Sequence, residues 1–286
     1  REGGHADILA ARQEGDRIGA PQVVCDRPGN QWGPAIATSD DGQVAVVWDS
    51  YEHGNYDVFL RRWAQGRWGE ILPVAASAAG EMRPSAVFDR AGRLWIAYEK
   101  SPELWGKDFG GLVKEKGVGL LMGRSVEVRV WDGTSWHEPA QPAAEALSGP
   151  PLLQRRPGAG SAARRRGTLA LPVLACDSAG RVWLSVRTSR AGTRVNVGTV
   201  WFNHMVWYEG DRWSNELICD RTDHWLDSRP ALATLPDGSL VMIAASDGRM
   251  ETAARLPEWF VQTLRREGQS LQLTAEPMAA RWPADL

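Results

Sequence analysis

The sequence predicts an all-β protein, a β-propeller made of four-stranded antiparallel blades. Three observations predict this fold: one hairpin template occurs four times, each copy turns on a glycine, and tryptophan recurs at fixed places in the repeat. The 286 residues include 15 Trp against five Phe and four Tyr. Such an excess is typical of a β-rich protein with aromatic anchors at repeated positions. A chain of this length can also bury a large core.

Four segments share the template. They read PAIATSDDGQVAVVW, PSAVFDRAGRLWIAY, PVLACDSAGRVWLSV and PALATLPDGSLVMIA, and they begin at Pro34, Pro84, Pro172 and Pro230. In each copy a glycine follows eight residues after the proline, within a DDG, RAG, SAG or PDG turn that suits a positive φ. The prolines are 50, 88 and 58 residues apart. Fixed offsets inside a repeat of variable spacing indicate blades that carry loop insertions.

A nearly continuous apolar strand follows each turn, at 44–48, 94–98, 182–186 and 240–244. Apolar residues on both faces predict a strand that is buried between two neighbouring sheets. Each unit then continues into a second hairpin, DVFLRRWAQGRW, VEVRVWDGTSW, NHMVWYEGDRW or FVQTLRREGQSL. Four hairpin-connected strands per unit are typical of a propeller blade.

The N-terminus matches the second half of a blade, because DILAAR at 7–12 aligns with DVFLRR at 57–62. We therefore expect a single propeller domain with a half blade at 1–28, and complete blades at 31–76, 80–142, 169–220 and 226–277. Residues 143–168 form a flexible basic insertion, and 278–286 form a tail or linker. Four complete blades and a half blade predict five blades in total, with six or seven as alternatives. We expect the chain to be part of a longer polypeptide.

Charge and composition exclude several classes of partner. Charged residues make up 24% of the chain and the net charge is −2, so neither nucleic acid nor an anionic membrane is expected as a partner. No run approaches the roughly 20 apolar residues of a membrane span, and no signal-peptide core is evident at the N-terminus. Cys25, Cys176 and Cys219 lack metal-type spacing, and we expect free thiols.

Function is predicted on one face of the propeller. The loops between strands two and three, and between blades, are long, whereas the other turns are short. Both long classes emerge on the same face, around the central channel, and loops on a rigid scaffold commonly carry function. Aromatic, charged and imidazole side chains gather there, as carbohydrate or peptide recognition requires. The candidates are Asp49, Tyr51, Asn55, Glu99, Trp105, Lys107, Asp108, Arg124, Arg187, His204, Asp223, His224, Arg229, Asp247 and Arg249.

Several of these positions have a structural alternative. Asp49 and Asp247 each end a strand, where a carboxylate commonly caps loop amides. Arg83 and Arg229 precede a template proline, a repeated position that favours an ion pair between blades over a substrate clamp. The insertion 105–110 has no counterpart in other blades, and blade packing does not explain its Lys-Asp pair.

Trp32 and Trp225 begin equivalent loops between blades and would serve as packing plugs. Catalytic templates are absent from the sequence: there is no HxH, HExxH, CxxC, GxSxG or Walker motif, and we expect no cofactor or metal. Of the five histidines, His204 and His224 fall on predicted loops. A glycosidase needs two opposed carboxylates. The candidates for such a pair are Asp49, Glu99, Asp223 and Asp247.

Two resemblances bear on these expectations. The turns invite comparison with the Asp boxes of sialidase propellers, but the stretch 39–42 lacks the residue between Asp and Gly, and no arginine triad can be assigned. WDSYEHGNYDVFLRR, YEKSPELWGKDFG and DSRPALATLPDGSLVMIAASDGR resemble the N-terminal propeller region of large bacterial proteins in which a PHP-type metal-dependent phosphoesterase-like domain follows. This resemblance covers 32–249, and its most specific part is Trp-Gly-Lys-Asp at 105–108. It implies a secreted, periplasmic or envelope location, and the PHP metal motif would lie beyond residue 286.

The predicted function is recognition or scaffolding without catalysis. The long-loop face would bind a glycan, a peptide or a partner domain that completes the propeller, within a larger hydrolytic protein. The alternative is a glycan-active hydrolase or lyase that uses carboxylate, His and Arg groups at the channel mouth.

Overall fold

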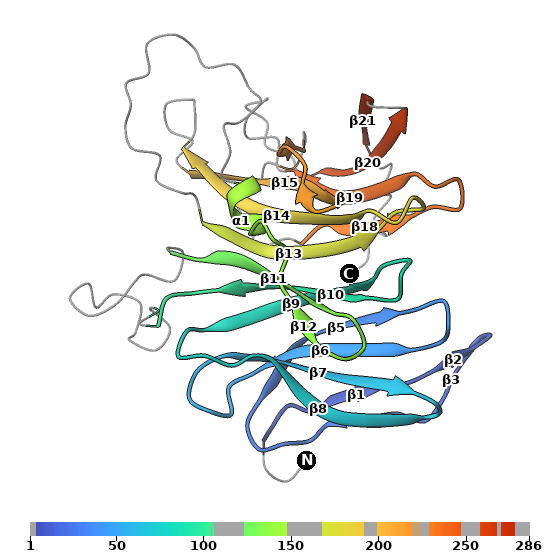
Figure 1. Ribbon diagram of the computed structural model, residues 1–286, viewed down its shortest axis with the longest axis vertical. Coiled ribbons are helices and arrows are strands. Elements are labelled where there is room, and N and C mark those ends of the chain that lie inside the picture. The colour runs from blue at the N-terminus through green and yellow to red at the C-terminus, as the bar shows by residue number, and fades with distance from the viewer. Residues whose placement is uncertain are drawn as a thin grey trace, which may run out of the picture. The chain divides into compact units, whose positions relative to one another are not determined.

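The computed structural model describes residues 4–103, 105, 123–147, 168–191, 199–219, 222, 229–246, 258–267 and 270–277. The chain divides into two compact units, Arg1–Pro139 and Ala140–Leu286. Apart from one short helix, the regular elements in the described part are antiparallel β-strands (Figure 1). The predicted all-β class is therefore confirmed.

The first unit contains two four-stranded sheets, each in sequence order. The strands of the first sheet are β5 (Gln31–Thr38), β6 (Val44–Ser50), β7 (Asp57–Ala64) and β8 (Arg67–Ala75). Those of the second are β9 (Glu81–Phe88), β10 (Leu94–Lys100), β11 (Ser125–Trp131) and β12 (Trp136–His137). Each predicted hairpin template forms the first two strands of a sheet, and the second hairpin forms the other two.

A smaller sheet precedes them. Strand β1 (Ile8–Ala10) pairs with β4 (Gln22–Cys25), and the connection between them carries the hairpin β2 (Gln13–Glu14) and β3 (Arg17–Ile18). Ile8 lies opposite Cys25 in this pair, as Val58 lies opposite Ala75 in the next sheet. Strands β1 and β4 thus occupy the places of strands three and four, as the alignment of 7–12 with 57–62 predicts.

Strand β6 is buried on both faces of the sheet β5–β8. On one side Val47, Leu60 and Val74 pack with Leu94 and Ile96 of the next sheet. On the other side Val46, Trp48 and Phe59 pack with Ile8, Val24 and Cys25 of the small sheet. Strand β6 contributes to both cores, which is why its sequence is apolar without alternation.

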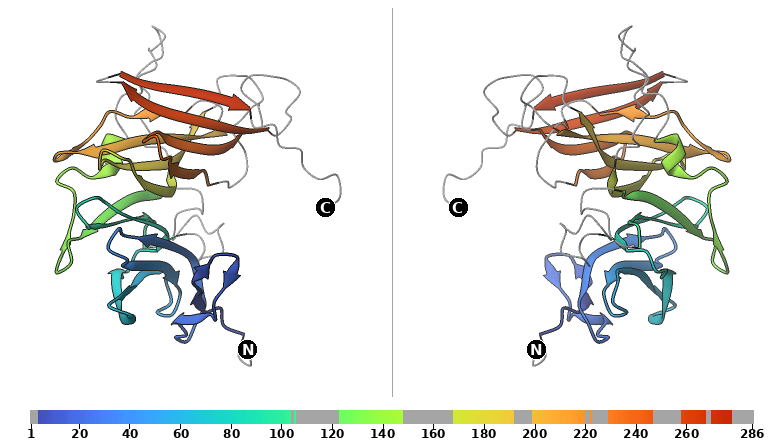
Figure 2. Two further views of the ribbon diagram at one scale, coloured as in Figure 1. Left: turned by 90° about the vertical axis from the view of Figure 1, so that its right-hand side faces the viewer. Right: turned by 90° about the vertical axis from the view of Figure 1, so that its left-hand side faces the viewer.

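The second unit also contains two sheets. In the first, β13 (Leu169–Cys176), β14 (Val182–Ala191) and β15 (Thr199–Glu209) lie in order, and β16 (Arg212–Trp213) and β17 (Leu217–Ile218) both pair with β15. The second comprises β18 (Ala231–Thr234), β19 (Leu240–Ser246), β20 (Glu258–Glu267) and β21 (Ser270–Pro277). Trp183 and Met205 pack with Leu240 and Met242 between the two sheets, which are stacked in Figure 2.

Residues Ala143–Ala146, at the start of the predicted flexible insertion, form the helical turn α1. The remainder of that insertion, apart from 147 and 168, lies outside the described residues, as does the predicted tail at 278–286. No helix in the described ranges is long and apolar enough to cross a membrane.

The four template turns have one geometry. In each, the glycine N–H donates to the carbonyl of the residue three positions earlier, and that earlier residue's N–H donates to the carbonyl four positions on. Gly42, Gly92, Gly180 and Gly238 have φ values of 82°, 77°, 83° and 83°, a region that disfavours other residues. This is the positive φ that the turn sequences predict. The three cysteines are free thiols, as expected.

Candidate functional site

A β-bulge lies near the loop end of three sheets, at the residue before the template prolines Pro34, Pro84 and Pro172. Gly33, Arg83 and Leu171 have φ values of 55°, 51° and 52° there, and the pairing of strands one and two shifts by a residue next to them. The left-handed region is costly for Arg and Leu, so surrounding contacts must hold these residues in place. Bulges re-aim nearby side chains and are common beside functional sites.

Asp49 holds the bulge at Arg83. Its Oδ2 accepts the backbone N–H of Arg83 at 2.6 Å, joining the end of β6 to the first strand of the next sheet. Oδ2 also lies 3.2 Å from the place that a Cβ on Gly33 would occupy, so the bulge in its own sheet favours glycine. Asp49 therefore accepts a backbone N–H, as a capping carboxylate does, although this N–H belongs to a strand of the neighbouring sheet and not to a loop as predicted.

Glu99, at the same strand position one sheet later, forms a buried ion-pair network. Its Oε2 lies 3.1 Å from Nη1 of Arg83 and 2.9 Å from Nη1 of Arg124. The Glu99 side chain is 0% exposed, that of Arg124 5% and that of Arg83 37%. The ion pair of Arg83 lies within a single sheet, so the prediction of a salt bridge between blades is wrong for this side chain. The link between sheets runs through its backbone N–H.

Four aromatic rings lie beside this network. The ring of Tyr56 is 5.5 Å from that of Trp32, 5.0 Å from that of Tyr51 and 6.4 Å from that of Trp105, centroid to centroid. Trp32 pairs with Asp49 between β5 and β6, and the Tyr56 carbonyl accepts the backbone N–H of Glu81, two residues before Arg83. Trp32 is 36% exposed. The four rings, together with the side chains of Asp49, Arg83, Glu99 and Arg124, are called the aromatic–charged cluster below.

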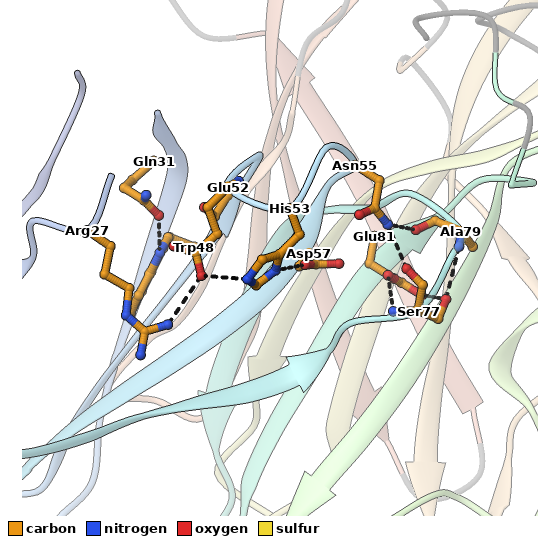
Figure 3. A network of polar contacts seen from close by, with 11 residues as sticks. Arg27, Gln31, Trp48, Glu52, His53, Asn55, Asp57, Ser77, Ala79 and Glu81 are labelled. Atoms are coloured by element: carbon orange, nitrogen blue, oxygen red, sulfur yellow. Dashed lines mark hydrogen bonds and ion pairs between the residues drawn. The ribbon is translucent and has the colours of Figure 1, made fainter. Parts of the chain in front are cut away.

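Asn55 secures the loop that carries Tyr56. Its Nδ2 donates to the carbonyls of Ser77 and Ala79 at 2.6 and 2.8 Å (Figure 3). Both hydrogens of the Asn55 amide are thereby bonded to a neighbouring loop. Asn55 therefore stabilises the loop conformation around the site.

A second polar network crosses the same loop (Figure 3). Arg27 pairs with Glu52 at 3.2 Å, and His53 lies between Glu52, 3.4 Å from Nε2, and Asp57, 2.8 Å from Nδ1. Asp57 is buried while His53 is largely exposed. An exposed imidazole beside a buried carboxylate is an arrangement suited to proton transfer. His53 is not among the predicted site residues.

Burial and hydrogen bonding shift the pKa values of three side chains at the loop end. Burial raises the pKa of Asp57, with the His53 hydrogen bond opposing it. The hydrogen bond that His53 makes to the Asp57 carboxylate raises the pKa of His53. Burial likewise raises the pKa of Glu81, whose carboxylate accepts bonds from the Ser77 hydroxyl and backbone N–H.

In the second unit, Arg187 occupies the strand position that Asp49 and Glu99 occupy in the first. The Arg187 side chain is buried, and its guanidinium carbon lies 4.4 Å from the ring centroid of Trp201. Pairing of β14 with β15 continues beyond this residue to Ala191 and Thr199. Arg187 therefore lies within a strand.

His204 is also a strand residue, and its assignment to a loop is wrong. It pairs with Val186 in the middle of β15 and is 1% exposed, and its Nδ1 lies 2.5 Å from Oε1 of Glu216. Both side chains of this pair are buried, at 1% and 4% exposed.

The structure thus brings together six predicted residues in the first unit: Asp49, Tyr51, Asn55, Glu99, Trp105 and Arg124. Arg229 is exposed just before β18. The remaining candidates, Lys107, Asp108, Asp223, His224, Asp247 and Arg249, lie outside the described residues. Within the described ranges, no three His, Cys, Asp or Glu side chains are grouped to hold a metal ion.

Neither a protein-family model nor a curated protein matches the sequence. Solved structures are similar in fold. The intramolecular trans-sialidase from Ruminococcus gnavus, in complex with oseltamivir carboxylate, gives a TM-score of 0.56 at 9% identity over 88% of this chain and 71% of that one. The α-L-arabinofuranosidase of Fusarium graminearum, with an iminosugar inhibitor, gives 0.51 at 14% identity over 96% and 71%. Penicillium chrysogenum α-L-arabinanase, complexed with arabinobiose, gives 0.51 at 12% identity over 86% and 66%.

These similarities place the chain in the β-propeller class. At such low identities they show the fold alone. The predicted fold class is confirmed to that extent, while the number of blades and the closure of the propeller stay predictions.

Proposed function

We propose that the loop end of the first unit is a carbohydrate-recognition surface that works without catalysis. The aromatic–charged cluster is the observation that carries this proposal. Partly exposed aromatic rings offer apolar faces to a sugar ring, and a few fixed polar groups beside them give orientation. The structures that share this fold and are named above were solved with sugar-like ligands or inhibitors, which supports a glycan over a peptide.

The state of the carboxylates supports recognition rather than hydrolysis. A glycosidase needs two carboxyl groups that face the scissile bond, one of them able to give a proton. Glu99 is fully buried and ion-paired with two arginines, and Asp49 is buried and holds a backbone N–H. Because these two carboxylates are occupied by protein partners, they stabilise the surface. The sugar would contact Trp32, Tyr51 and Arg83.

One observation favours the alternative, a glycan-active hydrolase or lyase. His53 is exposed, and its Nδ1 is held by a buried carboxylate, as in a proton-transfer group. Glu52 lies 3.4 Å from the His53 Nε2 and stabilises the charged imidazolium, so a smaller fraction of His53 is in the neutral form that a general base needs. The setting within a larger hydrolytic protein stays a proposal from the sequence resemblance.

The test is glycan-array binding followed by calorimetry on wild type and Trp32→Ala. We expect wild type to retain a glycan and Trp32→Ala to bind it at least about tenfold more weakly, as for an aromatic anchor. Trp63→Ala is the matched control, because Trp63 is also a partly buried ring of the first unit, paired with Trp68 near the opposite end of the sheet.

Equal binding by wild type and Trp32→Ala would contradict the proposal. Release of reducing or unsaturated sugar from the bound glycan by wild type, lost in His53→Ala, would establish the enzymatic alternative instead.

A further inference from the structure

The face between the two sheets of the second unit becomes polar toward its loop end. Trp183 of β14 and Met205 of β15 pack with the sheet of β18–β21. Ser185 and Arg187 lie on the same face as Trp183, because alternate residues of a strand share a face. Asn203 lies directly opposite Arg187 in β15. Ser185, Arg187 and Asn203 are 0%, 2% and 1% exposed, so all three are enclosed.

The equivalent positions in the first unit are apolar. Val47 holds the place of Ser185, the same number of residues after the template proline. Val58 holds the place of Asn203, because each lies opposite the same position of the second strand. Both valines are 0% exposed and belong to the core between two sheets. In the second unit a hydroxyl and an amide thus replace core methyl groups that the same fold accepts elsewhere.

These buried polar atoms reduce stability unless they are hydrogen-bonded. In the part of the chain that the structure describes, the Ser185 hydroxyl has no hydrogen-bond partner, and neither side-chain atom of the Asn203 amide has one. An unpaired polar group in a core costs free energy that an apolar residue of the same shape does not. Such groups commonly mark the place of a bound water or ion. The two replacements therefore indicate a site that binds a small polar species.

The charge beside these atoms indicates which species binds. Arg187 is buried, and its guanidinium carbon lies 4.4 Å from the ring centroid of Trp201. At the same strand position in the first unit, the Asp49 carboxylate accepts a hydrogen bond from the next sheet. Arg187 carries only donors, and the Ser185 hydroxyl and Asn203 amide can donate beside it. Several donors with a buried cation favour an anion, and the enclosure favours a small one.

We propose that Ser185, Arg187 and Asn203 form a binding site for a small anion of halide size, between the two sheets of the second unit. The anion accepts hydrogen bonds from the Ser185 hydroxyl, the Asn203 Nδ2 and the Arg187 guanidinium. It stabilises the second unit by satisfying buried donors. The site is independent of the proposed glycan recognition, whose residues belong to the first unit.

The test compares the Tm of the intact chain in chloride with that in gluconate at equal ionic strength, because gluconate is too large for an enclosed site. A ligand that binds only the folded state raises Tm, and we expect about 0.3 M chloride to raise it by at least about 3 °C over gluconate. Asn203→Val and Ser185→Ala should each remove most of this difference. Asn215→Val, at an exposed asparagine of the same unit, is the matched control and should keep it.

The Tm in gluconate shows whether the variants fold. Asn203→Val should melt no lower there than wild type, because it replaces an unpaired amide with the residue that the first unit carries. If this variant fails to fold, Ser185→Ala decides the test, since it removes a single hydroxyl.

Bromide locates the anion. Crystals of the intact chain grown in bromide should show an anomalous scattering peak within hydrogen-bond distance of the Ser185 and Asn203 side chains. Three outcomes would overturn the proposal. They are equal Tm of wild type in chloride and gluconate, a chloride effect that persists unchanged in Ser185→Ala and Asn203→Val, and an ordered water at the site in place of bromide.

Discussion

The two ends of the strands differ in how far they repeat. At the turn end, Asp89 and Asp177 make the same four hydrogen bonds, to two backbone N–H groups, an arginine Nε and a tryptophan Nε1. At the loop end, one strand position carries Asp49, Glu99 and Arg187 in successive sheets. The same residues thus recur at the turn end, where each sheet needs the same turn. Residue types differ between sheets at the loop end, as expected of a binding face.

The pKa shifts of the carboxyl groups also differ in direction between the two ends. Burial raises the pKa of Asp57 and Glu81 at the loop end. At the turn end, backbone N–H bonds from Ser135 and Thr134 lower the pKa of Asp132. Burial alone would raise the pKa of Asp177, but hydrogen bonds from Trp183 and Arg181 outweigh it and the pKa is lowered. Negative charge is therefore stabilised at Asp132 and Asp177 and disfavoured at Asp57 and Glu81.

The largest effect is expected from Glu99→Gln. Without its charge, Arg124 stays buried without compensation, and we expect a loss of about 3 kcal/mol in the free energy of unfolding, measured in urea. The half-exposed Arg83 should add little. The double variant Glu99→Gln, Arg124→Gln should recover most of the loss. If the single variant costs under about 1 kcal/mol, the ion-pair network does not hold the loop end.

The second test compares equivalent turns. Asp89→Ala and Asp177→Ala each leave a buried indole N–H without its acceptor, and each should cost about 2 kcal/mol. The matched control is Asp41→Ala in the first template turn, which should cost no more than about 0.5 kcal/mol because Asp41 is exposed. Costs that differ widely between Asp89 and Asp177 would contradict the equivalence of the turns.

The smallest effect is a pH dependence of opposite sign at the two ends. A raised pKa means that the folded state holds the proton more tightly, so the contribution of Asp57 is present below its unfolded pKa and is lost as pH rises through the folded value. Asp57→Asn should therefore gain stability relative to wild type as pH rises from about 4 to about 7. His53 and Glu81 act in the same direction, since the pKa of each is raised.

Asp132→Asn is the counterpart at the turn end. The lowered pKa of Asp132 gives a contribution that is present above its unfolded pKa and lost as pH falls through the folded value. This variant should lose stability relative to wild type as pH rises from about 2 to about 5. Thermal unfolding across both ranges tests the pair, and slopes of the same sign would refute the contrast.

The sequence by itself determined the repeat, the template turns and the all-β class. These follow from local chemistry: a glycine at a fixed distance from a proline sets the turn, and an apolar run marks a strand buried on both faces. The same reasoning predicts the half blade at the N-terminus, because strands three and four carry their own pattern.

Only the tertiary structure decided which loop-end residues meet. Arg83 and Arg124 are 16 and 25 residues from Glu99, and nothing in the spacing says that both guanidinium groups reach one carboxylate. The left-handed bulge at Arg83 was equally hidden, since a residue before proline normally favours extended backbone. His204 was also assigned wrongly, because its place depends on contacts between strands. Cross-strand pairing, which depends on the partner strand, extended β14 and β15 through a stretch that resembles a loop when it is considered alone.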